Sequence, residues 1–179
     1  FGQNKQVGFI FLLVTSASFA TFIFIKLDVH PYNIPYVLIP ILLRAFFDTR
    51  TALFTYLTSV FFCSLFVVYK YEFIIMELFP GIATLFLIVE VKKRSQTILA
   101  SVFVFVFYLV LFLVVKVSHE ESFVLFQKKF YLAFLISSLL ILTVYPLIFI
   151  TEKLFGFISD FTLIELCDLN QPLLRKISA

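Results

Sequence analysis

Charged side chains within apolar runs are the first residues of this sequence that could carry chemistry. Arg44, Asp48, Arg50 and Glu77 lie in or beside runs of Leu, Ile, Val and Phe. A charge inside hydrocarbon is costly, so such residues usually face a protein interior and are candidates for an intramembrane switch. The alternative is structural, because side chains near a membrane surface can reach toward water or lipid phosphates. Both interpretations stay open for all four residues.

Two of these charges have the spacing of a pair. Arg44 and Asp48 are four residues apart, so on a continuous helix they lie one turn from each other. We therefore expect them to interact near one membrane surface. Glu77 lies four residues after its apolar run begins at Phe73. It either reaches Lys70 or water, or it is buried.

Residues typical of catalysis or metal binding are scarce. The two histidines, His30 and His119, lie in polar loops, and no group of His, Asp and Glu has the spacing of metal ligands. The sequence contains neither a Gly-rich phosphate loop nor the elbow that presents a nucleophilic serine. We therefore expect no catalytic residue, no metal ligand and no cofactor-binding residue within the 179 residues.

The polar end of the chain carries a second set of candidate residues. Thr162 and Glu165 fit a capping box, in which each side chain accepts a hydrogen bond from the backbone amide of the other residue. A short helix should begin near Leu163 and end before Pro172, because the residue before a proline disfavours the α conformation. This helix is either a rigid strap to a following domain or an amphipathic helix resting on the membrane surface. The candidate strap residues are Thr162, Glu165, Asp168, Asn170 and Pro172.

The composition is that of an integral membrane protein. Hydrophobic residues make up 62% of the chain and charged residues 14%, with 27 phenylalanines. An ordinary soluble domain is about 45–50% apolar. The predicted fold class is therefore all-α, a polytopic bundle of about six transmembrane helices over residues 1–150, with a short juxtamembrane helix in residues 151–179. The apolar runs are 7–25, 34–47, 51–69, 73–91, 97–117 and 130–150.

One of the six runs is too short for a simple span. Residues 34–47 would reach about 21 Å as a helix, less than the roughly 30 Å of a bilayer core. This run is either a kinked or tilted span or a re-entrant half-helix. Two further runs should kink, one at Pro80-Gly81 and one at Tyr145-Pro146, because proline removes a helical hydrogen bond.

The distribution of Lys and Arg predicts the orientation of the bundle. If both ends of the chain are cytoplasmic, nine basic residues lie inside and five outside, provided that the second run crosses. The inner set is Lys5, Arg44, Arg50, Lys92, Lys93, Arg94, Lys153, Arg175 and Lys176, and the outer set is Lys26, Lys70, Lys116, Lys128 and Lys129.

Two stretches resemble one family of bacterial receptors. The first consists of Leu38-Ile39-Pro40, Arg44, Phe47-Asp48-Thr49-Arg50 and Ala52, and the second of Glu152-Lys153-Leu154-Phe155-Gly156, Ser159-Asp160, Thr162-Leu163, Glu165-Leu166, Asp168, Asn170 and Pro172-Leu173-Leu174-Arg175. Together they are similar to the membrane module and the junction of the seven-transmembrane receptors with an intracellular HD hydrolase. Cys167 and Gln171 depart from that pattern, where a small hydroxyl residue and a histidine are common. The departure at Gln171 argues against a chemical role for that position.

The resemblance implies a function that the chain carries out together with other domains. In that family, a cytoplasmic metal-dependent phosphodiesterase follows the last membrane helix, and characterised members hydrolyse cyclic di-AMP. The chain would then be a fragment with the last six of seven membrane helices, and the HD motif with its pair of divalent metal ions would follow it. Its partners would be the lipid bilayer, its own HD domain and an extracellular domain, in the bacterial cytoplasmic membrane.

A different class of function also fits the length of the chain. A small six-helix transporter component, such as the substrate-binding subunit of an uptake system, is the alternative. A substrate pocket between membrane helices needs converging polar groups, and the runs offer little beyond Ser, Thr and Glu77. Association with a second copy of the chain stays open, and no nucleic-acid partner is expected.

Overall fold

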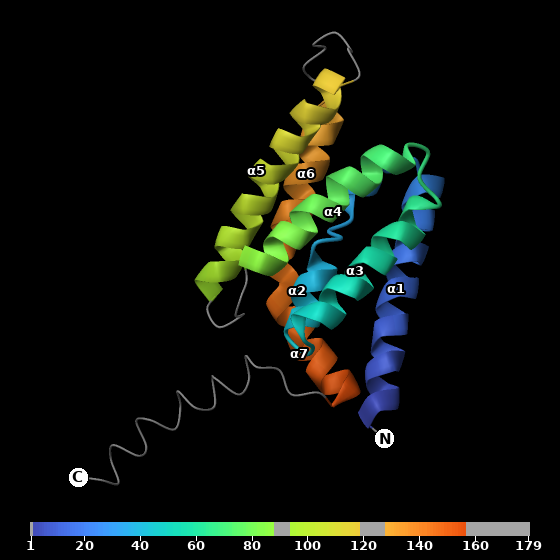
Figure 1. Ribbon diagram of the computed structural model, residues 1–179, viewed down its shortest axis with the longest axis vertical. Helices are drawn as coiled ribbons and strands as arrows, with labels where there is room; N and C mark the ends of the chain where they lie inside the picture. Colours follow the sequence, from blue (N-terminus) through green and yellow to red (C-terminus); the bar gives the residue numbers. More distant parts are fainter. Residues whose placement is uncertain (1, 88–93, 119–127, 157–179) are drawn as a thin grey trace, which may run out of the picture.

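The computed structural model describes residues 2–87, 94–118 and 128–156, and these contain helices and turns without a strand. The prediction of an all-α bundle is confirmed over these residues (Figure 1). In chain order, the elements are α1 (Gly2–Lys26), the 3-10 turn η1 (Pro31–Asn33), α2 (Leu38–Arg44), α3 (Thr49–Ser64), α4 (Lys70–Leu87), α5 (Arg94–Ser118), α6 (Lys128–Leu140), the 3-10 turn η2 (Ile141–Thr143) and α7 (Val144–Phe155).

Among the described residues, three stretches are long and apolar enough to cross a membrane. They are Lys5–Lys26, Thr97–Val115 and Phe130–Phe155, the last of which joins α6, η2 and α7. Helices α3 and α4 are shorter, at 16 and 18 residues, and run obliquely to α1 and α5 (Figure 1). Large apolar side chains are exposed along α1 and α5, among them Phe11, Phe19, Val102 and Val110. Such outward apolar faces suit a bundle surrounded by lipid.

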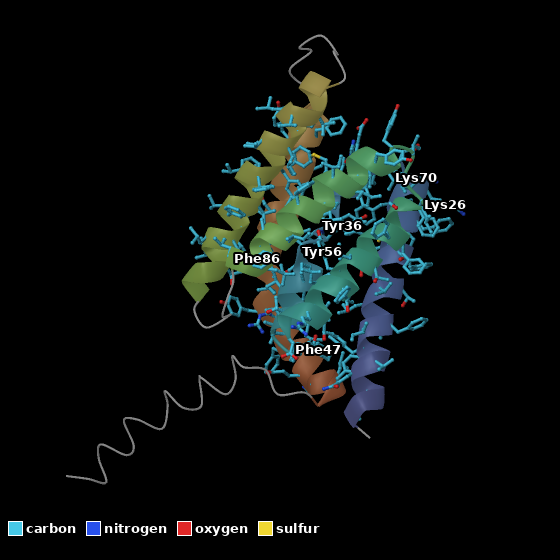
Figure 2. The ribbon with its side chains drawn as sticks, in the orientation of Figure 1. Lys26, Tyr36, Phe47, Tyr56, Lys70 and Phe86 are labelled. Atoms are coloured by element: carbon cyan, nitrogen blue, oxygen red, sulfur yellow. The ribbon has the colours of Figure 1, made fainter. Side chains whose placement is uncertain are left out.

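Both ends of the described chain lie at the same end of the bundle. Phe9, near the start of α1, is 2% exposed, and its ring centroid lies 4.9 Å from that of Phe155 at the end of α7. The same ring contacts Phe46 and Phe47, which precede α3, at 6.1 and 6.2 Å. We call Phe9, Phe46, Phe47 and Phe155 the terminal aromatic cluster. Lys26 and Lys70 lie at the other end (Figure 2).

The short second run forms a buried half-helix preceded by turns. Only Leu38–Arg44 is α-helical, and five of these seven residues are buried: Ile39, Pro40, Ile41, Leu42 and Leu43. Residues 27–37 descend through η1 from the end of α1, so the segment as a whole returns the chain to the end where α3 begins (Figure 1). Pro35 lies before the helix and Pro40 lies in its first turn, where a missing N–H breaks no helical hydrogen bond. The apolar side chains of α2 pack against α3, α4 and α7.

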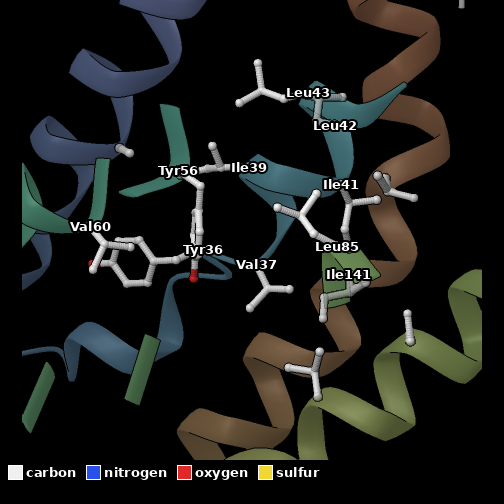
Figure 3. Close-up of a cluster of buried hydrophobic side chains, with 14 of the residues drawn as sticks. Tyr36, Val37, Ile39, Ile41, Leu42, Leu43, Tyr56, Val60, Leu85 and Ile141 are labelled. Carbon is white, nitrogen blue, oxygen red and sulfur yellow. The ribbon is translucent and has the colours of Figure 1, made fainter. Parts of the chain in front are cut away.

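The centre of the bundle is filled around this half-helix. Figure 3 shows Tyr36 and Tyr56 beside Val60, and Ile41 facing Leu85 of α4 and Ile141 of η2. All six of these side chains are at most 3% exposed. Since lipid tails are as apolar as these side chains, close packing rather than escape from water holds the helices together.

The expected break near Tyr145-Pro146 is present as η2. Pro146 cannot donate a hydrogen bond to the carbonyl of Leu142, and its ring crowds that carbonyl. The chain therefore tightens to a 3-10 turn at Ile141–Thr143 before α7 resumes. At the other predicted kink, Pro80 stays inside α4, which continues from Lys70 to Leu87.

Candidate functional site

Glu77 is the centre of a buried polar network within the bundle. Its side chain is 0% exposed, although it lies only seven residues after the start of α4 at Lys70. The Tyr108 hydroxyl of α5 donates a hydrogen bond of 2.7 Å to Glu77 Oε2. The other carboxyl oxygen, Oε1, is buried and has no hydrogen-bond partner within the described part of the chain. The structure thus gives Glu77 a buried environment rather than contact with Lys70 or water.

A second tyrosine reaches the backbone of the same residue. The Tyr56 hydroxyl of α3 donates to the Glu77 carbonyl oxygen at 2.5 Å. This approach depends on Gly81, since a Cβ atom there would overlap the Tyr56 ring. Pro80 stands beside it and has no N–H to offer the carbonyl of Met76. Gly81 therefore lets α3 pack closely against α4 at Glu77.

Further tyrosines surround the carboxyl group. Tyr32, Tyr36, Tyr56 and Tyr108 come from four different segments, and each lies within electrostatic range of Glu77. Tyr36 shares a hydrogen bond of 2.8 Å with Thr21 of α1, which extends the network to a fifth segment. None of these hydroxyl groups can carry a positive charge.

Aromatic rings close the network on the side of α6. The ring of Tyr108 stacks on Phe134 with centroids 5.1 Å apart and planes 6° apart. Phe73, one helical turn before Glu77, meets Tyr36 edge to face at 5.2 Å and stacks on Tyr32 at 5.9 Å. Phe73 and Phe134 are both fully buried. The carboxyl group is therefore held among rings that shield it from water and lipid.

The other predicted charges lie apart from this network. Arg44 ends α2 and is half-buried, and its Nη1 donates to the Phe47 carbonyl at 3.5 Å. Asp48 is exposed, with extended backbone (φ −62°, ψ 153°) just before α3, and Arg50 is exposed in the first turn of α3. The continuous helix that would place Arg44 and Asp48 one turn apart is interrupted, and their interaction stays a prediction.

The strap residues Thr162, Glu165, Asp168, Asn170 and Pro172 lie outside the described residues. What the structure describes is the helix that leads toward them. Helix α7 ends at Gly156, which adopts a left-handed conformation (φ 68°) and donates its N–H to the Glu152 carbonyl at 2.8 Å. Among the residues searched, which are those described, no group of three or more His, Cys, Asp and Glu could hold a metal ion.

Tyr108 and Tyr56 are the site residues that sequence reasoning missed. Each is one aromatic residue in a run of apolar ones and looks like ordinary packing. The feature that could have identified them is the hydroxyl group, which needs a hydrogen-bond partner when it is buried. Tyr108 lies ten residues before the end of α5 at Ser118, a depth similar to that of Glu77 in the antiparallel α4. Matching polar groups by depth on neighbouring helices would have paired the two.

One comparison with known proteins gives a match. The family model described as "7TM receptor with intracellular HD hydrolase" matches residues 1–159, most of the chain. No match was found among curated proteins or among solved structures.

Proposed function

Because the chain belongs to the family of seven-transmembrane receptors with an intracellular HD hydrolase, we propose that it is the signal-transmitting membrane module of a cyclic di-AMP phosphodiesterase. In this proposal, rearrangement of the membrane helices changes the rate at which the HD domain, with its pair of divalent metal ions, hydrolyses the dinucleotide. The membrane module supplies no catalytic residue. It supplies the position and stiffness of the helix that leads to the hydrolase.

The observation that carries this proposal is the terminal aromatic cluster. The helix that leads out of the bundle, α7, ends with Phe155 packed on Phe9 of α1, and Phe9 also packs on the segment between α2 and α3. A shift of α1 or α3 relative to the others therefore changes the surroundings of the α7 end. Such a change reaches a following domain only through a stiff connection, since a flexible linker would dissipate it.

The proposal is tested by loosening the cluster in the full-length protein. Phe9→Ala removes the ring that touches three others, whereas Phe11→Ala, at a position 70% exposed on the same helix, is the matched control. We expect Phe9→Ala to change the rate of cyclic di-AMP hydrolysis in reconstituted membranes and Phe11→Ala to leave it unchanged. Equal rates for both variants would refute transmission through the cluster, and a wild-type protein unable to hydrolyse cyclic di-AMP would refute the substrate.

The strap is tested separately. Thr162→Ala with Glu165→Ala removes both partners of the capping box, worth about 1 kcal/mol, which is enough to decide whether so short a helix forms. We expect membrane insertion to stay intact and hydrolysis to lose its dependence on the state of the membrane module. Two glycines inserted after Gly156 should have the same effect, and an unchanged dependence in both variants would favour the surface-helix interpretation.

The orientation of the bundle is part of the same proposal. We place both ends of the chain on the cytoplasmic side, as the excess of Lys and Arg suggests. In a background without the native cysteines, Lys93→Cys should resist a membrane-impermeant thiol reagent in intact cells, whereas Glu120→Cys should react. The opposite labelling pattern would invert the orientation.

A further inference from the structure

The Glu77 carboxyl group is buried without a charge of opposite sign beside it in the described structure, and the proposed hydrolase function gives no reason for this. An ionised carboxylate in a low-dielectric interior is costly unless a positive charge or several hydrogen-bond donors compensate it. Glu77 has one donor within the described structure, the neutral Tyr108 hydroxyl, and its Oε1 has none. Among the residues that the structure describes, no basic side chain acts on this carboxyl group.

The titratable groups that interact electrostatically with Glu77 within the described residues share one property. They are Tyr32 of η1, Tyr36 before α2, Tyr56 and Cys63 of α3, and Tyr108 of α5. Hydroxyl and thiol groups are neutral or negative in any protonation state, so none of them can supply a positive charge. Within the described part of the chain, a compensating charge would therefore have to come from a bound species.

We propose that Glu77 is the binding site of a small monovalent cation, either H⁺ or Na⁺, at the junction of α3, α4 and α5. A proton would bind at Oε1 and leave the group neutral. A sodium ion would use Oε1 together with other oxygen atoms. The carbonyl of Met76 is a candidate, because Pro80 cannot donate a helical hydrogen bond to it. Carboxylates combined with carbonyl groups released from helices bind Na⁺ or H⁺ in other membrane proteins.

Binding of a cation at Glu77 would change how three helices, α3, α4 and α5, pack against one another. Glu77 accepts a hydrogen bond from Tyr108 of α5 through its carboxyl group and one from Tyr56 of α3 through its carbonyl. An unoccupied, charged carboxylate would attract water and loosen this junction, whereas an occupied one lets the helices close. This inference does not rest on the hydrolase proposal, because it concerns the stability of the bundle alone.

The test follows thermal opening of the bundle in detergent. Cys63 is fully buried, so with Cys167→Ser a thiol-reactive dye reports the temperature at which the bundle opens. The chain is titrated with NaCl against choline chloride at constant ionic strength, and separately with pH. Glu77→Gln removes the charge with little change in shape, and Glu72→Gln is the control on the same helix.

Two results would support the inference. If the ligand is Na⁺, the opening temperature rises by about 3–5 °C for each tenfold increase in NaCl above half-saturation, in the wild type and Glu72→Gln only. If the ligand is H⁺, sodium has no effect and the opening temperature falls as pH rises, because the proton is lost, again only in these two proteins. A wild type insensitive to both, or a Glu77→Gln variant that keeps the same sensitivity, would overturn the inference.

A second variant serves if Glu77→Gln does not fold. Tyr108→Phe removes the hydroxyl group that holds Oε2 and keeps the ring. It should move the half-effective concentration of the bound species, Na⁺ or H⁺, by about tenfold, as expected for one hydrogen bond to a charged group. An unchanged half-effective concentration in this variant would overturn the inference as well.

Discussion

Gly81→Ala tests whether α3 and α4 are held together at Glu77. A Cβ atom at position 81 would overlap the ring of Tyr56, which is fully buried and cannot turn away into solvent. Overpacking of this kind costs about 1–3 kcal/mol. Displacing the ring also breaks the hydrogen bond from Tyr56 to the Glu77 carbonyl, which is worth about 0.6–1.7 kcal/mol between membrane helices. The expected loss of stability is therefore about 2–4 kcal/mol.

The matched control is Gly8→Ala. Gly8 also lies in a helix, and a Cβ atom there would meet nothing within 4 Å. Since alanine is the better helix former by about 0.8–1 kcal/mol, this variant should be as stable as the wild type or more stable. Thermal unfolding in detergent should show a midpoint about 5–15 °C lower for Gly81→Ala and no decrease for Gly8→Ala.

A double variant identifies the cause of the loss. Tyr56→Ala removes the ring and is itself destabilising, by about 3–5 kcal/mol for a large buried side chain. In that background, Gly81→Ala should cost little more, because the added methyl group no longer has a ring to meet. The coupling energy between the two positions should exceed 1 kcal/mol, within the range seen for residues in contact. Equal midpoints for Gly81→Ala and Gly8→Ala, or strict additivity in the double variant, would refute this reasoning.

Three further substitutions probe the buried hydroxyl groups and the end of α7. Tyr108→Phe should destabilise the bundle by about 1–3 kcal/mol, because a buried carboxyl oxygen loses its donor, whereas Tyr71→Phe, 86% exposed, should not change the unfolding midpoint. Thr21→Val and Tyr36→Phe should shift the unfolding midpoint non-additively in a double-mutant cycle, since the two hydroxyl groups share a hydrogen bond. Additive shifts of the midpoint would contradict that hydrogen bond. Gly156→Ala should lower the midpoint through a cost of about 1–2 kcal/mol, as expected for a side chain in the left-handed conformation; an unchanged midpoint would show that α7 ends differently.

The helical architecture could be predicted from the sequence because the thickness of the hydrocarbon layer fixes the length of a membrane-spanning helix. The runs beginning at Val7, Thr97 and Phe130 each correspond to a stretch able to cross a membrane. The short run at 34–47 was ambiguous for a physical reason, since a half-helix and a tilted span have the same apolar composition. Burial on all sides of Ile39–Leu43 depends on neighbouring helices, which no local pattern reveals.

Only part of the candidate site could be predicted from the sequence. Glu77 stood out because a carboxyl group in an apolar run is rare. Its surroundings could not be predicted, because Tyr56 and Tyr108 lie 21 and 31 residues away in sequence, and their approach depends on how three helices pack. The interaction of Arg44 with Asp48 rested on a continuous helix, and the chain instead bends between α2 and α3.

Pro80 and Gly81 show how one sequence signal can have two physical outcomes. Read alone, the pair predicts a weak point in a helix, because one residue removes a hydrogen bond and the other adds freedom. In the bundle, the missing side chain of Gly81 admits the Tyr56 ring, so the same pair becomes a point of close contact between α3 and α4. The buried α2 packs against both α4 and α7, so it adjoins both the Glu77 network and the helix leading out of the bundle, as α1 does through Thr21 and Phe9. Spatial adjacency alone does not establish coupling. A cation that tightens α4 at Glu77 acts on α7 through α2 only if α2 has two packed positions, one for each state of the carboxyl group.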